Sequence, residues 1–230
     1  MKDNIPEFAG NLRKHMLKVP ECIYAASGIK IFGKRIKSLV FTTDVGIIRN
    51  VNADAVIAVY PFTPQPVITQ AILLAADIPV FCGIGGGITQ GKRVVNNALF
   101  AEFQGAMGVV VNAPTPNDVI AAVRETVDIP VVVTVVSETD DLPGRLEAGA
   151  SIINVSGGAA TPHIVRSLRT RYPALPIIAT GGTSEASISA TIAAGANAVT
   201  WTPPAPAELL RQIMEQYRTG QMELPDSRRE

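Results

Sequence analysis

The sequence has few of the residues that build disulfides or metal sites. Its 230 residues include two cysteines, Cys22 and Cys82, and two histidines. Two cysteines without paired spacing form neither a disulfide framework nor a zinc site, so we expect reduced thiols in a cytoplasmic protein. The chain also lacks the His-x-His and His-Glu-x-x-His spacings that hold catalytic metals. We therefore expect no tightly held metal.

The chain also lacks long apolar runs and an excess of charge of one sign. Charged or polar residues interrupt every apolar run before about 18 residues, and the N-terminus has no signal-peptide core, so we expect no membrane segment. Twenty Lys and Arg balance twenty Asp and Glu. No overall field attracts nucleic acid or anionic lipid, so neither is an expected partner.

Lysine is missing from most of the sequence. Every lysine except Lys92 precedes residue 38. Enzymes that bind their substrate as a Schiff base need a lysine in the active site, and none lies on the strands predicted below. Aldolase chemistry of that kind is therefore not expected.

What the chain does contain is a repeat of short apolar runs and longer helix-like segments. Near-continuous hydrophobicity, as in VVVTVV, is typical of parallel strands covered on both faces by helices. The eight runs span residues 38–43, 55–60, 80–83, 108–112, 131–136, 151–155, 177–180 and 198–202. Eight such units predict a single-domain (β/α)₈ TIM barrel, with a doubly wound open sheet as the alternative.

The predicted barrel covers residues 38–220. Before it, residues 1–37 are expected to form a short helix over 8–17 and a β-hairpin from Ile29 to Arg35 that closes the N-terminal end of the barrel. After it, residues 221–230 form a polar tail that we expect to fray.

Three Thr-Pro pairs mark expected helix starts within the barrel. They begin at Thr63, Thr115 and Thr161. Each places a hydroxyl at the N-cap and a proline at the first helical position, which is the preferred arrangement of these two residue types.

The stretch IIATGGTSEASISATIAAGANAVTWTP, residues 177–203, resembles the last quarter of the phosphate-binding TIM barrels. That superfamily includes ribulose-phosphate-binding enzymes, sugar-phosphate aldolases and epimerases, and flavin barrels. The resemblance covers the C-terminal half of the chain and implies that Gly181 and Gly182 bind a phosphate through backbone amides. The second phosphate-binding turn departs from the pattern, because Pro203 and Pro204 supply no N–H donors. The whole chain is also similar to uncharacterised bacterial barrel proteins labelled hydrolases.

In a TIM barrel the reactive residues lie in the turns after the strands. Asp44 ends the first strand and is either a general base or a helix N-cap. Glu138 follows the fifth strand and is either a second catalytic carboxylate or an acid at a helix start. His163, near the turn after the sixth strand, is the third catalytic candidate because histidine titrates near neutral pH. A plain surface histidine is its alternative.

A glycine-rich turn follows the third strand. Gly85, Gly86 and Gly87 would let the backbone approach an anion closely, with Lys92 assisting at the following helix N-terminus. The spacing from Gly86 to Lys92 fits a nucleotide-binding P-loop, but Arg93 stands where Ser or Thr should hold magnesium. A simple tight turn is the alternative.

Polar residues also close two of the later strands. Asn112 and Asn154 end the fourth and sixth strands, and Ser156 follows the sixth. Amide groups are costly to bury unless they form hydrogen bonds. We therefore predict that these residues contact a ligand, with internal hydrogen bonding of the two asparagines as the alternative.

These candidates predict an enzyme that acts by acid/base chemistry on a small phosphorylated or carboxylated metabolite. Hydrolase, lyase and isomerase chemistry remain open. An FMN-binding oxidoreductase is one alternative, because the hairpin before the first strand resembles that of flavin barrels, and a non-catalytic metabolite-binding barrel is the other. No cofactor is required by the first prediction, and FMN or Mg²⁺ are the alternatives. Apolar segments at residues 72–76 and 98–103 predict a homo-oligomer.

Overall fold

The computed structural model describes residue 6, residues 16–182 and residues 184–220. The polar tail predicted over 221–230 lies outside these ranges, as do residues 8–15 of the predicted N-terminal helix. Leu17, at the end of that predicted helix, instead forms an isolated parallel bridge with Val51.

Eight parallel strands close into a barrel, in which each strand pairs with the next and β10 pairs with β3. The fold is therefore the predicted TIM barrel, and the open sheet is wrong. Each strand begins and ends within two residues of its predicted bounds. The strands are β3 (Ser38–Phe41), β4 (Ala55–Ala58), β5 (Val80–Gly85), β6 (Gly108–Val111), β7 (Val131–Val135), β8 (Ile152–Val155), β9 (Ile177–Thr180) and β10 (Ala198–Trp201).

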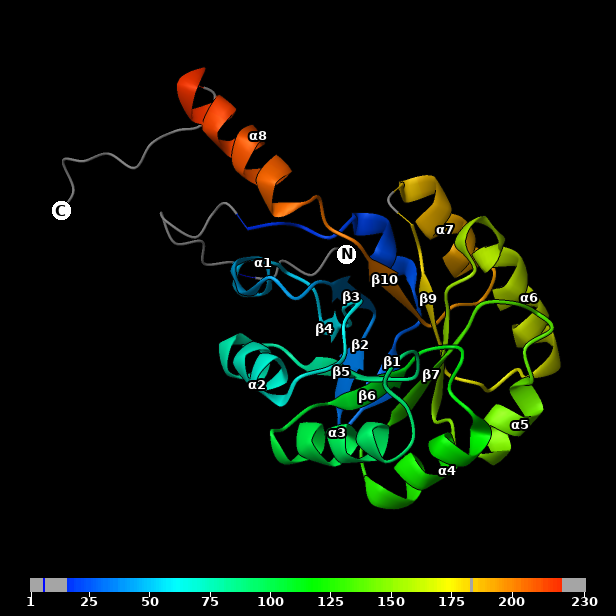
Figure 1. Cartoon of the computed structure of the whole chain (residues 1–230). Coiled ribbons are helices and arrows are strands. Elements are labelled where there is room, and N and C mark those ends of the chain that lie inside the picture. Colours follow the sequence, from blue (N-terminus) through cyan, green and yellow to red (C-terminus); the bar gives the residue numbers. More distant parts are fainter. Residues whose placement is uncertain (1–5, 7–15, 183, 221–230) are drawn as a thin grey trace.

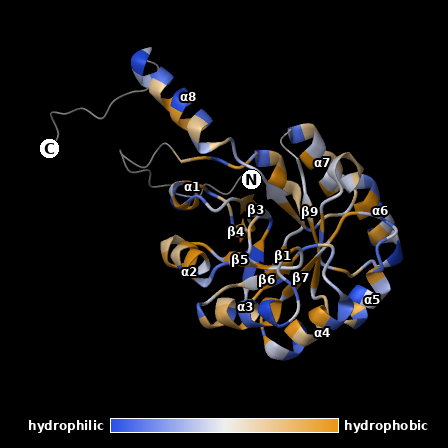
Figure 2. Cartoon of the chain, viewed as in Figure 1, coloured by the Kyte–Doolittle hydropathy of each residue, from blue (hydrophilic) through white to orange (hydrophobic). Residues whose placement is uncertain are grey.

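Helices surround these strands (Figure 1). The strands are coloured as the most hydrophobic part of the chain in Figure 2, because helices cover their outer faces and side chains fill the barrel between them. The helices are α1 (Val45–Arg49), α2 (Pro66–Ala75), α3 (Lys92–Phe103), α4 (Asn117–Thr126), α5 (Leu142–Glu147), α6 (Thr161–Arg171) and α7 (Glu185–Ala193).

The three predicted threonine N-caps are wrong. Helix α2 begins three residues after Thr63. The Thr115 hydroxyl donates to the Asn112 carbonyl at 2.8 Å, ahead of α4. Thr161 is the first residue inside α6, and its hydroxyl accepts from the Gly157 N–H at 3.0 Å. At the last two positions the hydroxyl bonds to the backbone of the preceding turn, so it stabilises the turn and not the helix end.

A two-stranded hairpin, β1 (Ile29–Ile31) and β2 (Lys34–Ile36), precedes the barrel. The side chains of Ile29, Ile31 and Ile36 are buried in one cluster with inward-facing barrel residues such as Leu39 and Phe81. The hairpin therefore closes the amino end of the barrel with apolar side chains.

The outer ring is completed in an unusual way between α7 and α1. The 3₁₀ helix η1 (Glu21–Ala25) packs against α7, and its Ile23 is fully buried. Helix α8 (Pro206–Arg218) instead projects away from the barrel, and none of its residues is buried (Figure 1). Among the helices within the described ranges, none has both the length and the apolar character needed to cross a membrane.

Candidate active site

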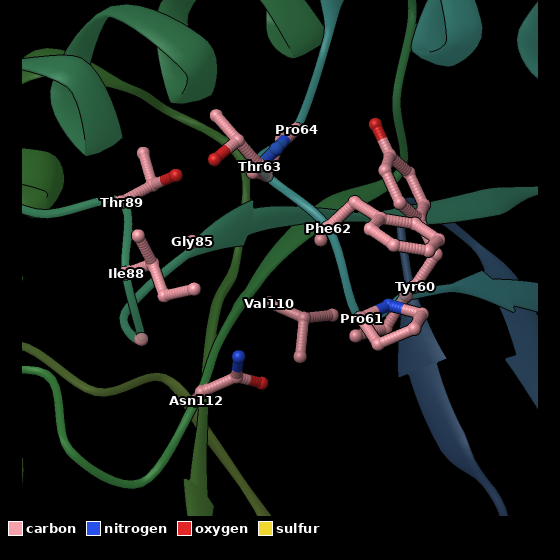
Figure 3. A pocket seen from close by; sticks show the side chains of 13 residues that line it. Tyr60, Pro61, Phe62, Thr63, Pro64, Gly85, Ile88, Thr89, Val110 and Asn112 are labelled. Atoms are coloured by element: carbon pink, nitrogen blue, oxygen red, sulfur yellow. The ribbon is translucent and has the colours of Figure 1, made fainter.

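The carboxyl ends of β4, β5 and β6 surround a cavity of about 180 Å³ (Figure 3). Ligand pockets commonly reach about 300 to 1,000 Å³, so this cavity suits a small molecule or one part of a larger one. Its lining comes mainly from the loops after these strands and consists of Val59, Tyr60, Pro61, Phe62, Thr63, Pro64, Gly83, Gly85, Gly87, Ile88, Thr89, Val110 and Asn112.

Besides Tyr60, three uncharged polar side chains line this cavity. Thr63, Thr89 and Asn112 stand around it, with Ile88 and Val110 between them (Figure 3). The Thr89 hydroxyl is buried and has no hydrogen-bond partner among the described residues. Because an unpaired buried hydroxyl is costly, this group is suited to bind a ligand. Sequence reasoning missed Thr89, since a threonine in a loop usually contacts water.

The glycine turn after β5 positions Asn112. The Gly86 N–H donates to the Thr89 carbonyl at 2.9 Å, and the Asn112 N–H donates to the Gly85 carbonyl at 3.1 Å. A side chain on Gly86 would overlap the Thr115 hydroxyl. The glycines therefore let the β5 loop pack against the β6 loop, which carries Asn112.

Only some of the predicted anion-binding residues of this turn line the cavity. Gly85 and Gly87 line the cavity, whereas Gly86 contacts the β6 loop. Lys92 is exposed at the first position of α3 and is not part of the cavity lining. The glycines of this turn thus allow close packing against the loop after β6, and Lys92 is not part of the cavity lining; anion binding by the turn stays a prediction.

The other half of the barrel interior carries polar side chains toward its carboxyl end. Partners in a parallel ladder face the same side, so Thr134 and Asn154 point inward with Ile178 and Ala198. The Asn154 amide nitrogen donates to the Thr134 hydroxyl at 3.2 Å. Inward-facing Thr180 and Thr200 continue this wall on β9 and β10. None of these three threonines was predicted from the sequence.

Two predicted catalytic residues meet at the rim of this polar half. Glu138 follows β7 and His163 lies in the first turn of α6, after β8. Their Oε1 and Nε2 atoms are 3.2 Å apart, an ion-pair distance, but the contact is not aligned as a hydrogen bond. The side chains of Glu138 and His163 are 37% and 76% exposed. Catalytic contacts without a ligand are often loose in this way.

Ser156 lies directly after β8, between Asn154 and the turn that leads to His163. Its N–H donates to the Val135 carbonyl at 2.9 Å, which extends the β7–β8 ladder. Asn154, Ser156, Glu138 and His163 therefore come from two neighbouring strands and their turns.

Asp44 is placed differently. Its Oδ1 accepts from the Ile47 N–H at 2.9 Å, so it is the N-cap of α1. It lines a groove with residues of α1 and α8, including Leu209, and is not among the residues of the mouth cavity. The helix-cap interpretation of Asp44 is the one that the structure shows.

The resemblance implies that the Gly181 amide binds a phosphate, and this prediction is wrong. The N–H of Gly181 donates to the Thr200 carbonyl at 3.1 Å, and its carbonyl accepts from the Ser187 hydroxyl at 2.6 Å. This amide is part of the strand ladder and is not free to bind a phosphate. Gly182, with φ of +76°, follows at the partly buried end of the turn.

Cys82 is a buried core residue. It is 2% exposed, and burial raises the pKa of its thiol to about 12. A thiol with so high a pKa is not a nucleophile at neutral pH. Cys82 therefore serves as a small hydrophobic side chain of the core.

The residues that line the mouth cavity include no His, Cys, Asp or Glu, so the cavity itself offers no metal ligand of these types. No group of three such residues converges in the described part of the chain. The Gly181 amide is also already bonded, so it cannot bind the phosphate of FMN.

No protein-family model matches the sequence, and no curated protein matches it. Solved structures do resemble its fold. A phosphonopyruvate hydrolase is 16% identical, covers 86% of this chain and 90% of its own, and has a TM-score of 0.63. A 2,3-dimethylmalate lyase, a member of the PEP mutase/isocitrate lyase superfamily, is 13% identical over 91% of this chain and 89% of its own, with a TM-score of 0.62. A phosphoenolpyruvate phosphomutase from Streptomyces platensis is 12% identical, covers 79% and 81%, and has a TM-score of 0.60.

What these proteins share with the chain is the barrel. At such low identity the likeness shows the TIM-barrel fold and no more. It does not support the narrower resemblance to ribulose-phosphate-binding barrels, because these neighbours belong to other enzyme groups.

Proposed function

We propose that the protein is an enzyme that acts by acid/base chemistry on a small carboxylated or phosphorylated metabolite at the carboxyl mouth of the barrel. The observation that carries this proposal is the 3.2 Å contact between Glu138 and His163. Two ionisable groups from different turns meet at the rim where TIM barrels perform their chemistry. The similar structures, which include a phosphonopyruvate hydrolase and a dimethylmalate lyase, are enzymes with small substrates of this kind.

In the proposed mechanism His163 exchanges a proton with the substrate. Its Nε2 faces Glu138, which leaves Nδ1 for the reacting group. The Glu138 carboxylate orients the imidazole and stabilises the imidazolium that forms when the ring takes up a proton. Glu138 is thus a positioning residue, and His163 is the catalytic residue.

The proposed ligand contacts favour a carboxylate over a more highly charged phosphate. Thr89 and Asn112 offer uncharged hydrogen-bonding groups, and the nearest predicted cation, Lys92, lies outside the cavity. Protonated His163 supplies a single positive charge at the rim. A carboxylate is matched by one such charge, whereas a phosphate dianion is not.

Mg²⁺ was bound together with oxalate in one of the similar structures, a phosphonopyruvate hydrolase. No group of three His, Cys, Asp or Glu residues converges among the described residues of this chain, and the proposed mechanism uses protein side chains alone. Self-association also remains a prediction. The two apolar segments proposed for it expose Leu74 and Phe103, which are 79% and 75% exposed.

The proposal is tested with His163→Asn and Glu138→Gln, and with Glu147→Gln as a control on an exposed face of α5. A panel of 2-oxo, 2-hydroxy and phosphono acids is incubated with each protein and followed by NMR. We expect one of them to be converted, with kcat lowered roughly 100-fold or more by His163→Asn and unchanged by Glu147→Gln. Glu138→Gln should shift the pH profile. Unchanged kcat in His163→Asn would remove this residue from the mechanism, and binding without conversion would favour a non-catalytic barrel.

A further inference from the structure

We infer that Asn154 and Thr200 together bind a hydroxyl group of the ligand inside the barrel, so that the ligand is a hydroxylated small molecule. The identity of this ligand as a substrate rests on the proposed function. The binding site itself is argued from the barrel interior alone.

The strand register places Asn154 and Thr200 in one layer of the interior. Asn154 pairs with Ile178 on β9, and Ile178 pairs with Ala198 on β10. In an eight-stranded barrel of this type, the residue at equal height on the next strand lies one position beyond the paired residue in the ladder. Inward-facing residues of alternate strands therefore form layers of four. From β8 to β10 the offset is two residues, so the layer of Asn154 includes Thr200, which lies two positions after Ala198.

The same construction completes the layer with two apolar residues. The same pairing and offset, applied from Asn154 in the opposite direction around the barrel, give Val110 on β6 and Ile57 on β4. The layer is therefore half apolar and half polar. Val110 also lines the mouth cavity, so the apolar side of this layer borders the cavity.

Both polar members of the layer have an oxygen atom without a partner. Asn154 is 7% exposed and Thr200 is 4% exposed. Asn154 Oδ1 and Thr200 Oγ1 are buried and have no hydrogen-bond partner among the described residues. Buried polar atoms are nearly always paired in folded proteins, so two unpaired atoms in one layer indicate a position that a ligand or a water completes.

The chemistry of the two atoms selects the ligand group. The Asn154 amide nitrogen is already used by Thr134, so its Oδ1 remains as an acceptor. The Thr200 hydroxyl can both donate and accept. A ligand hydroxyl donates to Asn154 Oδ1 and accepts from Thr200, and so satisfies both atoms at once.

A charged group is excluded from this position. The layers on either side hold uncharged side chains only, namely Leu39, Phe41, Phe81, Gly83, Val132, Thr134, Ile178 and Thr180. A buried carboxylate would have no cation beside it and no proton to give to Asn154 Oδ1, which makes its burial costly. The hydroxyl end of the ligand therefore lies deep, and its acidic end lies at the rim near His163.

Thermal unfolding separates a ligand site from a structural hydrogen bond. Thr200→Val keeps the shape of the side chain and removes a hydroxyl that has no partner. Thr191→Val, its matched control, removes a buried hydroxyl that donates to the Ser187 carbonyl at 2.8 Å. We expect Thr191→Val to lower the Tm and Thr200→Val to leave it unchanged or higher. An equal loss of Tm in both variants would contradict the inference.

Binding measurements then test the hydroxyl preference. The probes are glycolate against acetate, lactate against propionate, and malate against succinate, measured by calorimetry at millimolar concentration. We expect at least one hydroxylated member to bind roughly tenfold tighter or more than its partner. Thr200→Val should remove this preference without weakening the partner, while Thr191→Val and Glu138→Gln should retain it.

Four further results would overturn the inference: no hydroxylated probe binds, no preference exists, the preference survives in Thr200→Val, or a crystal structure with a bound hydroxy acid shows only a water between Asn154 and Thr200. Because these experiments measure binding, they are independent of turnover. If experiments show that His163 is not catalytic, the hydroxyl preference can still hold. The two proposals can therefore fail independently.

Discussion

Gly86 and Thr115 occupy adjoining space where the loops after β5 and β6 meet. A Cβ on Gly86 would overlap the Thr115 hydroxyl and would lie 2.9 Å from the Asn112 backbone nitrogen. The φ of Gly86 is +101°, which only glycine adopts without strain. We expect Gly86→Ala to lower the free energy of unfolding by about 2 kcal/mol or more, because strain and overlap add.

Gly87 provides the control for this substitution. It has no positive φ, and a Cβ there would meet only the Asn112 side-chain nitrogen, at 3.9 Å. Gly87→Ala should therefore change the unfolding free energy by less than about 0.5 kcal/mol. Urea unfolding measures both variants, and equal losses would show that the two loops do not pack as described.

Asp44 is expected to contribute to stability and not to turnover. Its Oδ1 is bonded to the Ile47 N–H at the start of α1. Asp44→Ala should lower the unfolding free energy by about 1 kcal/mol, whereas Asp44→Ser, which retains a cap, should restore most of it. Both variants should keep the kcat of the parent protein. A large loss of kcat in the stable Asp44→Ser variant would restore Asp44 as a catalytic candidate.

The thiol of Cys82 should not react in the folded protein. Burial raises its pKa from 9.0 to about 12, so it stays protonated at pH 8. We expect a thiol reagent to label the partly exposed Cys22 first, and a Cys22→Ser variant to react only as it unfolds. Labelling of Cys82 in the native Cys22→Ser variant at the rate of a free thiol would contradict this.

The same shift gives a stability prediction at alkaline pH. The folded-state pKa of Cys82 is raised above its unfolded value, so its contribution to stability is fully present below about pH 9 and is lost as the pH rises toward 12. Urea unfolding at pH 8 and pH 10.5 should show a smaller decrease in Cys82→Ala than in the parent protein. An equal decrease in the two proteins would show that groups other than Cys82 cause the loss of stability at alkaline pH.

Helix α8 should be dispensable for the barrel. No residue of α8 is buried, and η1 occupies the wall beside α7. A chain ending at Pro204 should keep a cooperative thermal transition within a few degrees of the parent. By comparison, Ile23→Ala should cost about 2 to 4 kcal/mol, because Ile23 is fully buried. Loss of cooperative unfolding in the shortened chain would show that α8 supports the barrel.

The strands could be predicted from the sequence because both of their faces are buried. Burial on both sides forces a continuous apolar run, and each run was bounded by turn residues. The helix starts were harder. Thr115 and Thr161 have the chemistry of N-caps, but their hydroxyls bond to the Asn112 carbonyl and the Gly157 N–H in the turns before the helices. Sequence spacing does not distinguish these two local partners.

The candidate site could be predicted in part. Because the carboxyl ends of parallel strands meet at one rim, Glu138, His163 and Asn154 could be assigned to the same end of the barrel. The role of Asp44 depends on which way its carboxylate turns, and the helix N–H groups decide that. Thr200 was not found, because a threonine within an apolar strand reads as a β-branched core residue.

The hairpin at the amino end of the barrel limits where a ligand can enter and leave the molecule. Ile29, Ile31 and Ile36 close the amino end, and buried side chains fill the barrel above them. A ligand can therefore enter and leave only through the carboxyl mouth. The end of the ligand that enters first lies deepest, so a group that reacts at the rim belongs to the end that enters last.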